Sequence, residues 1–308
     1  MTSIKACFVV LVVVVFYQTT TLGDLVTEST SDNRLTSRKF MEFLPNSVES
    51  LESLIVEGGD VIKAKSYDKL IQMYKDNDDK EALMALTKNA HILSFNYKHS
   101  SATLQNTKNL RGSKQGYQFA DKCIAEYESD PAKLYECLKW KAALYETDII
   151  EGNVLMSKTS LDQLKKVLIQ MDKIKENNPD IPDDPFVTFL KGRIICEIKL
   201  MSDVGKFSFK KSQSLYGDII DHKQETIQTC INKLKDFESE VGDSGQFRES
   251  KLLLGIAYLA DRKWPEAQYW LQKAMDIPVR DTEGKLKNRA AQIALEKLQL
   301  KLFPNTFK

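Results

Sequence analysis

The residue types that usually carry catalysis are few in this chain and lie far apart. The three histidines, His91, His99 and His222, do not have the spacing of metal ligands. The chain contains no His-Glu-x-x-His, Gly-x-Ser-x-Gly or Cys-x-x-Cys motif and no phosphate-binding Walker loop. Carboxylates are abundant, but they follow the polar faces of the predicted helices. The sequence therefore predicts a protein that is not an enzyme and that uses no metal ion and no cofactor.

One acidic run, Asp76-Asn77-Asp78-Asp79, has the residue types of a calcium-binding loop. Such a loop needs an acid or amide at its fifth position and glycine at its sixth, where this chain has Lys80 and Glu81. We therefore interpret the run as the end of one helix and the N-terminal cap of the next.

Four of the five cysteines lie in predicted helices, and Cys7 lies in the N-terminal segment. We favour buried, reduced thiols in the helix cores, because free cysteine behaves as a small apolar residue. The alternative is a set of disulfides between stacked helices, such as Cys123–Cys137 or Cys196–Cys230, which would fit an oxidising compartment.

Two basic clusters are candidates for partner binding. The first combines cations with aromatic residues in a segment where the helical pattern fails, and consists of Lys206, Phe207, Phe209, Lys210 and Lys211. The second lies in another long polar stretch and consists of Lys108, Arg111 and Lys114. Long loops often bind partners, and cations suit an acidic protein surface. The alternatives are plain solvation for the lysines and, for the two aromatic residues, filling of a gap in the fold.

The first residues have the pattern of a secretory signal peptide. Lys5 precedes the apolar residues 6–17, polar residues follow, and Gly23 offers a small residue for cleavage. The apolar run is shorter than the ~20 residues that span a bilayer. We expect residues 1–23 to be a signal peptide, which places the chain in the secretory pathway, either secreted or in the ER lumen. The alternative is an uncleaved N-terminal anchor on a cytoplasmic domain.

Composition and periodicity predict that these residues are positioned by helices alone. The chain of 308 residues is 42% hydrophobic and 28% charged, has 13 glycines and 8 prolines, and shows no alternating apolar pattern. The formal net charge of +1 gives no global field that would attract nucleic acid. Residues 24–46 read as a flexible lead-in. The first helix is expected to start near Val48 and to continue through Gly58-Gly59, where another helix would cross closely.

Residues 247–278 have the spacing of a tetratricopeptide repeat, in which small residues let two helices cross. The six positions that carry this pattern are Leu254, Gly255, Tyr258, Ala267, Leu271 and Ala274. Since one such unit cannot bury its apolar face alone, we expect neighbours on which it stacks. The prediction is an all-α fold over residues 47–302, with antiparallel helix pairs stacked as a tetratricopeptide-like solenoid. Residues 201–223 interrupt it as an insertion, and a C-terminal helix caps it.

The first helices of stacked repeats line a concave face that binds peptides or helices. By their position in the repeats, Lys139, Arg193 and Lys251 would line this face. The sequence therefore favours a non-enzymatic scaffold that binds a protein partner.

The order of these pieces resembles the regulator of microtubule dynamics family. The resemblance covers about residues 47–298 and rests on residues 64–83, 134–144, 189–196 and 252–291, with the insertion where that family interrupts its repeats. It implies divergent tetratricopeptide-like repeats and no catalysis. It also implies binding to microtubules or, in an anchored member, a contact between organelles. A signal peptide would instead imply a secreted or lumenal repeat protein with an unknown protein or small-molecule partner.

Overall fold

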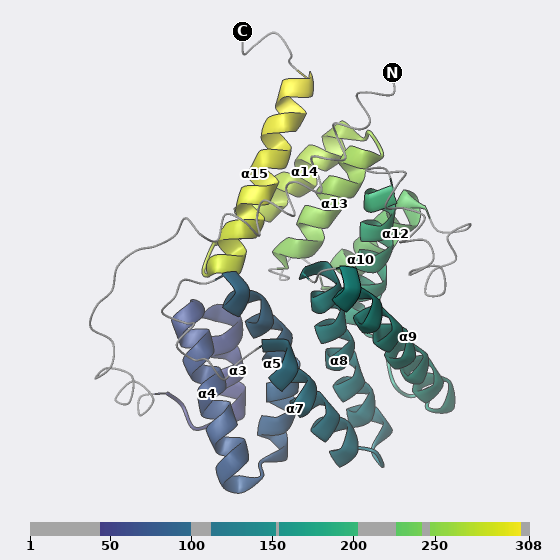
Figure 1. The fold of residues 1–308 in the computed structure, drawn as a ribbon. Coiled ribbons are helices and arrows are strands. Elements are labelled where there is room, and N and C mark those ends of the chain that lie inside the picture. Colours follow the sequence, from purple (N-terminus) through teal and green to yellow (C-terminus); the bar gives the residue numbers. More distant parts are fainter. Residues whose placement is uncertain (1–43, 100–111, 152–153, 203–225, 242–246, 303–308) are drawn as a thin grey trace. The chain divides into compact units, whose positions relative to one another are not determined.

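The computed structural model describes residues 44–99, 112–151, 154–202, 226–241 and 247–302 (Figure 1). Within these residues every regular element is an α-helix, and neighbouring helices pack against each other in succession. This confirms the predicted all-α, solenoid-like fold. None of the described helices is long and apolar enough to cross a bilayer. The chain forms two compact units, which we describe separately.

The N-terminal unit comprises the described part of Leu22–Pro182 together with Arg280–Glu283. Each of its helices packs on the next in the chain, and the third also packs on the fifth. The helices are α3 (Val48–Glu57), α4 (Asp60–Asn77), α5 (Lys80–His99), α7 (Gly112–Glu126), α8 (Pro131–Glu151) and α9 (Val154–Asn177). The apolar faces of α3, α4, α5, α7 and α8 meet in one core that includes Leu51, Leu70, Leu86 and Leu144, each fully buried.

The Gly58-Gly59 pair separates α3 from α4, whereas the sequence predicted one helix through it. Gly58 follows the last residue of α3 and Gly59 precedes the first residue of α4, both with extended backbone. Each glycine inside a helix would cost about 1 kcal/mol relative to alanine. The chain therefore uses the pair as a joint rather than as a crossing point.

The acidic run Asp76–Asp79, where α4 ends and α5 follows, has the capping role that the sequence predicted. Asp78 ends α4 in the left-handed conformation, with φ of 51°. The Asp79 carboxylate then accepts hydrogen bonds from the backbone N–H groups of Glu81 at 2.9 Å and Ala82 at 3.1 Å. These are the free donors of the first turn of α5.

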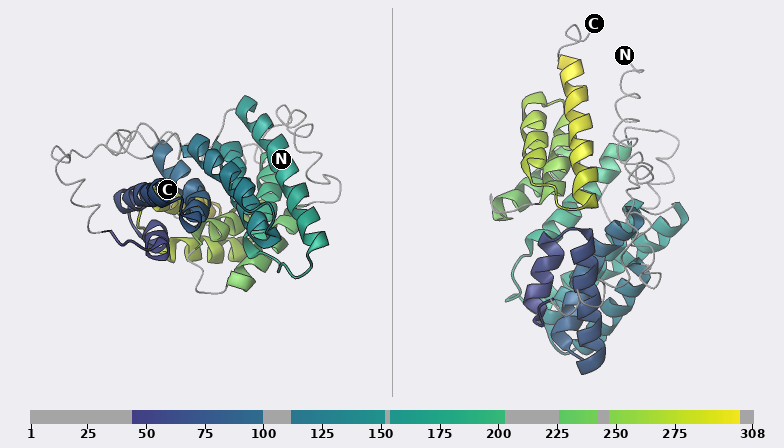
Figure 2. Two further views of the ribbon diagram at one scale, coloured as in Figure 1. Left: turned by 90° about the horizontal axis from the view of Figure 1, so that it is seen from below. Right: turned by 90° about the vertical axis from the view of Figure 1, so that its left-hand side faces the viewer.

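The C-terminal unit comprises the described part of Asp183–Val279 and Gly284–Lys308. Its helices are α10 (Pro185–Ser202), α12 (Ile227–Val241), α13 (Arg248–Ala260), α14 (Trp264–Asp276) and, from Gly284 onward, α15 (Thr282–Leu302). Helix α13 packs on α10, α12 and α14, and every residue from Ser250 to Leu259 is buried. Figures 1 and 2 show α15 alongside α13 and α14. The buried residues of α15 include Ala291 and Leu298, as expected of a capping helix.

The α13–α14 pair is the repeat that the sequence identified. Leu254, Gly255 and Tyr258 are buried on α13, and Ala267, Leu271 and Ala274 are the buried residues of α14. A methyl group added at Gly255 would lie 2.5 Å from Leu271 Cγ and 3.1 Å from the Leu271 backbone nitrogen. The glycine is therefore required by the close approach of the two helices.

Candidate functional site

The predicted basic clusters lie almost entirely outside the described residues. This applies to Lys206, Phe207, Phe209, Lys210, Lys211, Lys108 and Arg111. Lys114 belongs to the first turn of α7, but the position of its side chain is not described. Partner binding by these clusters therefore stays a prediction.

Lys139 lies on α8 in a buried cluster rather than on an open face. Its Nζ atom is 2.6 Å from Glu136 Oε2 and 4.8 Å from the centre of the Trp140 ring. The other oxygen of Glu136 accepts a hydrogen bond from the Trp140 indole N–H at 2.7 Å. The imidazole of His91 on α5 stacks on the same indole, with ring centres 5.2 Å apart. The ammonium group is therefore committed to contacts inside the N-terminal unit.

Arg193 and Lys251 are committed in the same way inside the C-terminal unit. Arg193 Nη2 lies 2.7 Å from Glu249 Oε1, and Lys287 Nζ lies 2.9 Å from Glu249 Oε2. One carboxylate on α13 thus joins a cation on α10 to a cation on α15. Lys251 Nζ pairs with Glu238 Oε2 of α12 at 2.7 Å. Both paired groups are about nine-tenths buried.

The expected placement of Lys139, Arg193 and Lys251 on an open concave face is not supported by this geometry. A modest rotation of a helix about its axis moves a side chain from a groove to the seam between helices. At the seam a cation needs a carboxylate partner, because an unpaired buried charge is strongly destabilising. Each of the three has such a partner, and we assign them a structural role.

Arg248, at the start of α13, binds the C-terminal end of α14. Its Nε donates to the carbonyl of Ala274 at 3.1 Å, and its Nη2 donates to the carbonyl of Ile277. The last carbonyl groups of a helix have no partner within the helix, and a cation there also interacts favourably with the helix dipole. Arg248 therefore fixes the C-terminal end of α14 against α13.

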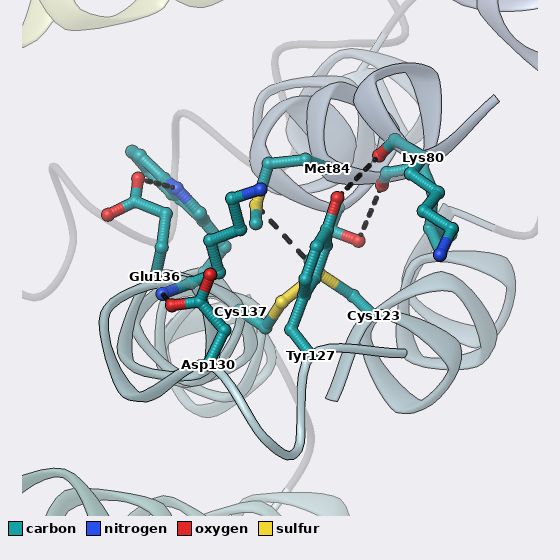
Figure 3. The surroundings of a disulfide bond; sticks show 11 residues. Lys80, Met84, Cys123, Tyr127, Asp130, Glu136 and Cys137 are labelled. Atoms are coloured by element: carbon teal, nitrogen blue, oxygen red, sulfur yellow. Dashed lines mark hydrogen bonds between the residues drawn. A yellow bond between two sulfur atoms is a disulfide. The ribbon is translucent and has the colours of Figure 1, made fainter. Parts of the chain in front are cut away.

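All four described cysteines are paired in disulfides, although we favoured reduced thiols. Cys123 of α7 is bonded to Cys137 of α8, with Cα atoms 5.8 Å apart (Figure 3). Cys196 of α10 is bonded to Cys230 of α12, with Cα atoms 5.1 Å apart. All four residues are fully buried. Both Cα separations fall in the ordinary range for disulfides, so each bond joins two helices that already pack together.

The first disulfide lies in a densely packed part of the N-terminal unit. Cys123 Sγ is 3.8 Å from Met84 Sδ on α5. Directly after α7, the Tyr127 hydroxyl donates to the carbonyl of Lys80 at 3.3 Å (Figure 3). The Lys80 ammonium pairs with Glu126, the last residue of α7. The bond is therefore shielded from solvent reagents by α5 as well as by the two helices that it joins.

A polar contact between α7 and α8 was missed from the sequence. The Tyr117 hydroxyl donates to Asp148 Oδ2 at 2.8 Å, and the Tyr117 and Tyr145 rings lie 4.7 Å apart. Burial raises the pKa of the Tyr117 phenol, and the charge of the Asp148 carboxylate raises it further. The phenol is therefore held protonated as a hydrogen-bond donor, which suits a structural contact and not a catalytic base. The sequence does contain a sign of this contact: Asp148 is a charged residue four positions after the buried Leu144, on the apolar face of α8.

Neither the potential metal ligands among the described residues nor the comparisons with known proteins identify the function of this chain. Among the residues that the structure describes, no three His, Cys, Asp or Glu side chains come together as metal ligands. No model of a protein family matches the chain, and no curated protein matches it. The observations thus define a class only: an all-helical, solenoid-like protein with a disulfide in each of its two units.

Proposed function

We propose that this chain is a non-enzymatic scaffold that binds a protein partner through tetratricopeptide-like repeats. The observation that carries the proposal is the α13–α14 pair, in which a glycine allows the close crossing and six patterned positions are buried. Stacked helix pairs of this kind present long surfaces whose common use is protein binding.

We further propose that the scaffold works in the secretory pathway or outside the cell. The disulfides Cys123–Cys137 and Cys196–Cys230 support this, because such bonds persist in oxidising compartments and are rare in the cytosol. The signal-peptide pattern of residues 1–23 points the same way.

A second candidate is a cytoplasmic protein associated with microtubules or an organelle membrane. It is favoured by the resemblance in the order of the stretches 64–83, 134–144, 189–196 and 252–291, each of which lies within the described residues. This candidate requires an uncleaved N-terminal segment, since a lumenal protein does not meet tubulin.

N-terminal sequencing and thiol counting on the protein from its native source distinguish the two candidates. The secretory candidate predicts a chain that starts near Asp24 and has no free thiol, because Cys7 leaves with the signal peptide. The cytoplasmic candidate predicts an intact N-terminus with Cys7 as a free thiol. A mature chain that retains residues 1–23 would exclude the secretory candidate in its cleaved form.

Microtubule co-sedimentation tests the second candidate directly. The informative variant changes Lys206, Lys210 and Lys211 to Glu. The matched control changes three exposed lysines, Lys166 and Lys173 of α9 and Lys235 of α12, to Glu. Binding through the first basic cluster predicts that the triple variant stays in the supernatant while the control pellets like the natural protein. Equal pelleting of all three proteins would remove this cluster from the proposal, and absence of pelleting by the natural protein would reject the microtubule candidate.

A further inference from the structure

The short segment Arg280–Glu283 belongs to the N-terminal unit, although it follows α14 in the chain. It contacts the first turn of α4, 222 residues away in sequence. Three independent contacts hold it there: an ion pair, a helix cap made by a distant residue, and a close backbone approach.

The ion pair joins Asp281 to Lys63 of α4. Asp281 Oδ2 lies 2.6 Å from Lys63 Nζ, and the two side chains are only 11% and 6% exposed. Lys63 lies on the same side of α4 as buried Tyr67, where a charge has little access to water. Removal of one member of such a pair leaves the other as an uncompensated buried charge, which strongly destabilises the contact.

The helix cap is made by Asp60, the first residue of α4. Its carboxylate accepts the backbone N–H of Thr282 at 3.2 Å and the Thr282 hydroxyl at 2.5 Å. Thr282 is the first residue of α15, so its N–H group has no acceptor within that helix. Asp60 also lies in the first turn of its own helix, and negative charge is favoured at the N-terminus of both helices.

The backbone fit involves Gly59. A methyl group at Gly59 would lie 3.3 Å from the carbonyl oxygen of Arg280. The φ angle of Gly59 is −76°, which any residue can adopt. The close approach of Arg280, and not an unusual backbone conformation, therefore explains why this position is a glycine.

We propose that Arg280–Glu283 is a docking strap, which binds the first turn of α4 and is released from it by local opening without unfolding of the unit. The ion pair and the cap are polar contacts, and both Val279, which precedes the segment, and Arg280, its first residue, are exposed. Segments held in this way open at a lower free energy than helices that share a hydrophobic core. Release also removes the carboxylate that accepts the Thr282 N–H group.

Hydrogen exchange of the full chain, measured by mass spectrometry, tests the strap. In Asp281→Asn we expect amide exchange to accelerate about tenfold or more in peptides covering residues 60–66 and 280–286. Peptides from α7 and α8 should exchange as in the natural protein. The control is Arg289→Gln, which removes an exposed cation of α15 that lies 3.9 Å from Glu296; it should leave both segments unchanged.

Two further variants keep the test decisive. Thr282→Val removes the hydroxyl contact without changing any charge, and it replaces Asp281→Asn should that variant not fold. Lys63→Met combined with Asp281→Asn removes both charges, and should exchange more slowly in the two segments than Asp281→Asn alone. Unchanged exchange at residues 60–66 in both Asp281→Asn and Thr282→Val would overturn the proposal. A uniform acceleration throughout the chain would overturn it as well, because the segment would then open only with the whole fold.

Discussion

Gly255 of α13 has no room for a side chain where this helix meets α14. Its replacement by alanine would place a carbon 2.5 Å from Leu271 Cγ, with the backbone of α14 only 3.1 Å away. Alanine favours a helix over glycine by about 1 kcal/mol, while overpacking costs about 1–3 kcal/mol. We expect Gly255→Ala to lower the free energy of unfolding by about 1–2 kcal/mol in urea denaturation.

Gly192 provides the matched control for this experiment. It lies on α10 and faces α12, and an added methyl group would lie 3.0 Å from Lys233 Cβ and 3.5 Å or more from other atoms. Gly192→Ala should therefore cost less than Gly255→Ala. A Gly255→Ala protein as stable as the natural one would mean that α13 and α14 separate freely at their crossing.

Tyr117 should give the unfolding free energy a dependence on alkaline pH. The folded chain raises the phenol pKa above its ordinary value of 10, so beyond pH 10 the unfolded chain ionises first. The stabilisation is complete below pH 10 and is lost as the pH rises above it. We expect the urea midpoint to fall more steeply above pH 10 in the natural protein than in Tyr117→Phe.

Other tyrosines limit the size of this effect. The pKa values of Tyr127, Tyr145 and Tyr258 are also raised, mainly by burial, so Tyr117→Phe should reduce the slope without abolishing it. Tyr269→Phe, at a residue that is 52% exposed, is the control and should keep the natural slope. Identical slopes in the natural protein and in Tyr117→Phe would contradict the assignment.

At the residue scale, the sequence predicted the positions of the buried repeat residues better than it predicted which side chains form ion pairs. The six repeat positions were predictable, because two crossing helices require small and large residues at fixed intervals. The ion pairs of Arg193 and Lys251 were not, since the partner of a side chain depends on how far each helix rotates about its axis. The Gly58-Gly59 joint was mistaken for a crossing because its neighbour, Arg280, is more than two hundred residues away in sequence.

At the scale of elements, each disulfide joins two helices that are consecutive among the described residues of its unit. Cys123–Cys137 encloses a sequence separation of 14, and Cys196–Cys230 encloses one of 34. If each bond acts by restricting the unfolded chain, its loss costs about 3 kcal/mol for the shorter loop and about 4 kcal/mol for the longer one.

This difference can be measured with two double variants. Cys123→Ala with Cys137→Ala removes the first bond, and Cys196→Ala with Cys230→Ala removes the second. We expect both to lower the free energy of unfolding, the second slightly more than the first. Cys7→Ala, outside both bonds, should have no effect on the folded domain. A double variant as stable as the natural protein would show that its disulfide is not needed for stability.

Helix pairing was predictable from sequence, because short polar breaks such as Asp76–Asp79 separate amphipathic helices. The apolar faces of such neighbouring helices must be buried against each other. Disulfide pairing was left open, since the cysteine spacing alone does not show which helices bring Cβ atoms together. The structure resolves this through helix succession: α7 packs on α8, and α10 packs on α12.

At the scale of the whole molecule, the two units place one buried disulfide each in separate cores. All four cysteines are fully buried, so a thiol reductant reaches a bond only when the surrounding helices separate. We expect the native protein to resist dithiothreitol and to release thiols in two kinetic phases as urea is raised, one phase for each unit.

Alkylation followed by mass spectrometry assigns each phase to its cysteine pair. Release of all four thiols at a single rate would show instead that the two units unfold as one. Rapid reduction of either bond without denaturant would show that its burial is not maintained in solution.

The burial of α13 on every side has a consequence for how this chain can vary. Helices α13 and α14 are each 13 residues long, yet α13 is buried from Ser250 to Leu259 and α14 only at Ala267, Leu271 and Ala274. In a library of random single substitutions selected for folding, α13 should appear as a continuous block of intolerant positions. Helix α14 should instead tolerate change at most positions, leaving its outer face free to diverge among descendants of this chain while the helix beneath it stays fixed.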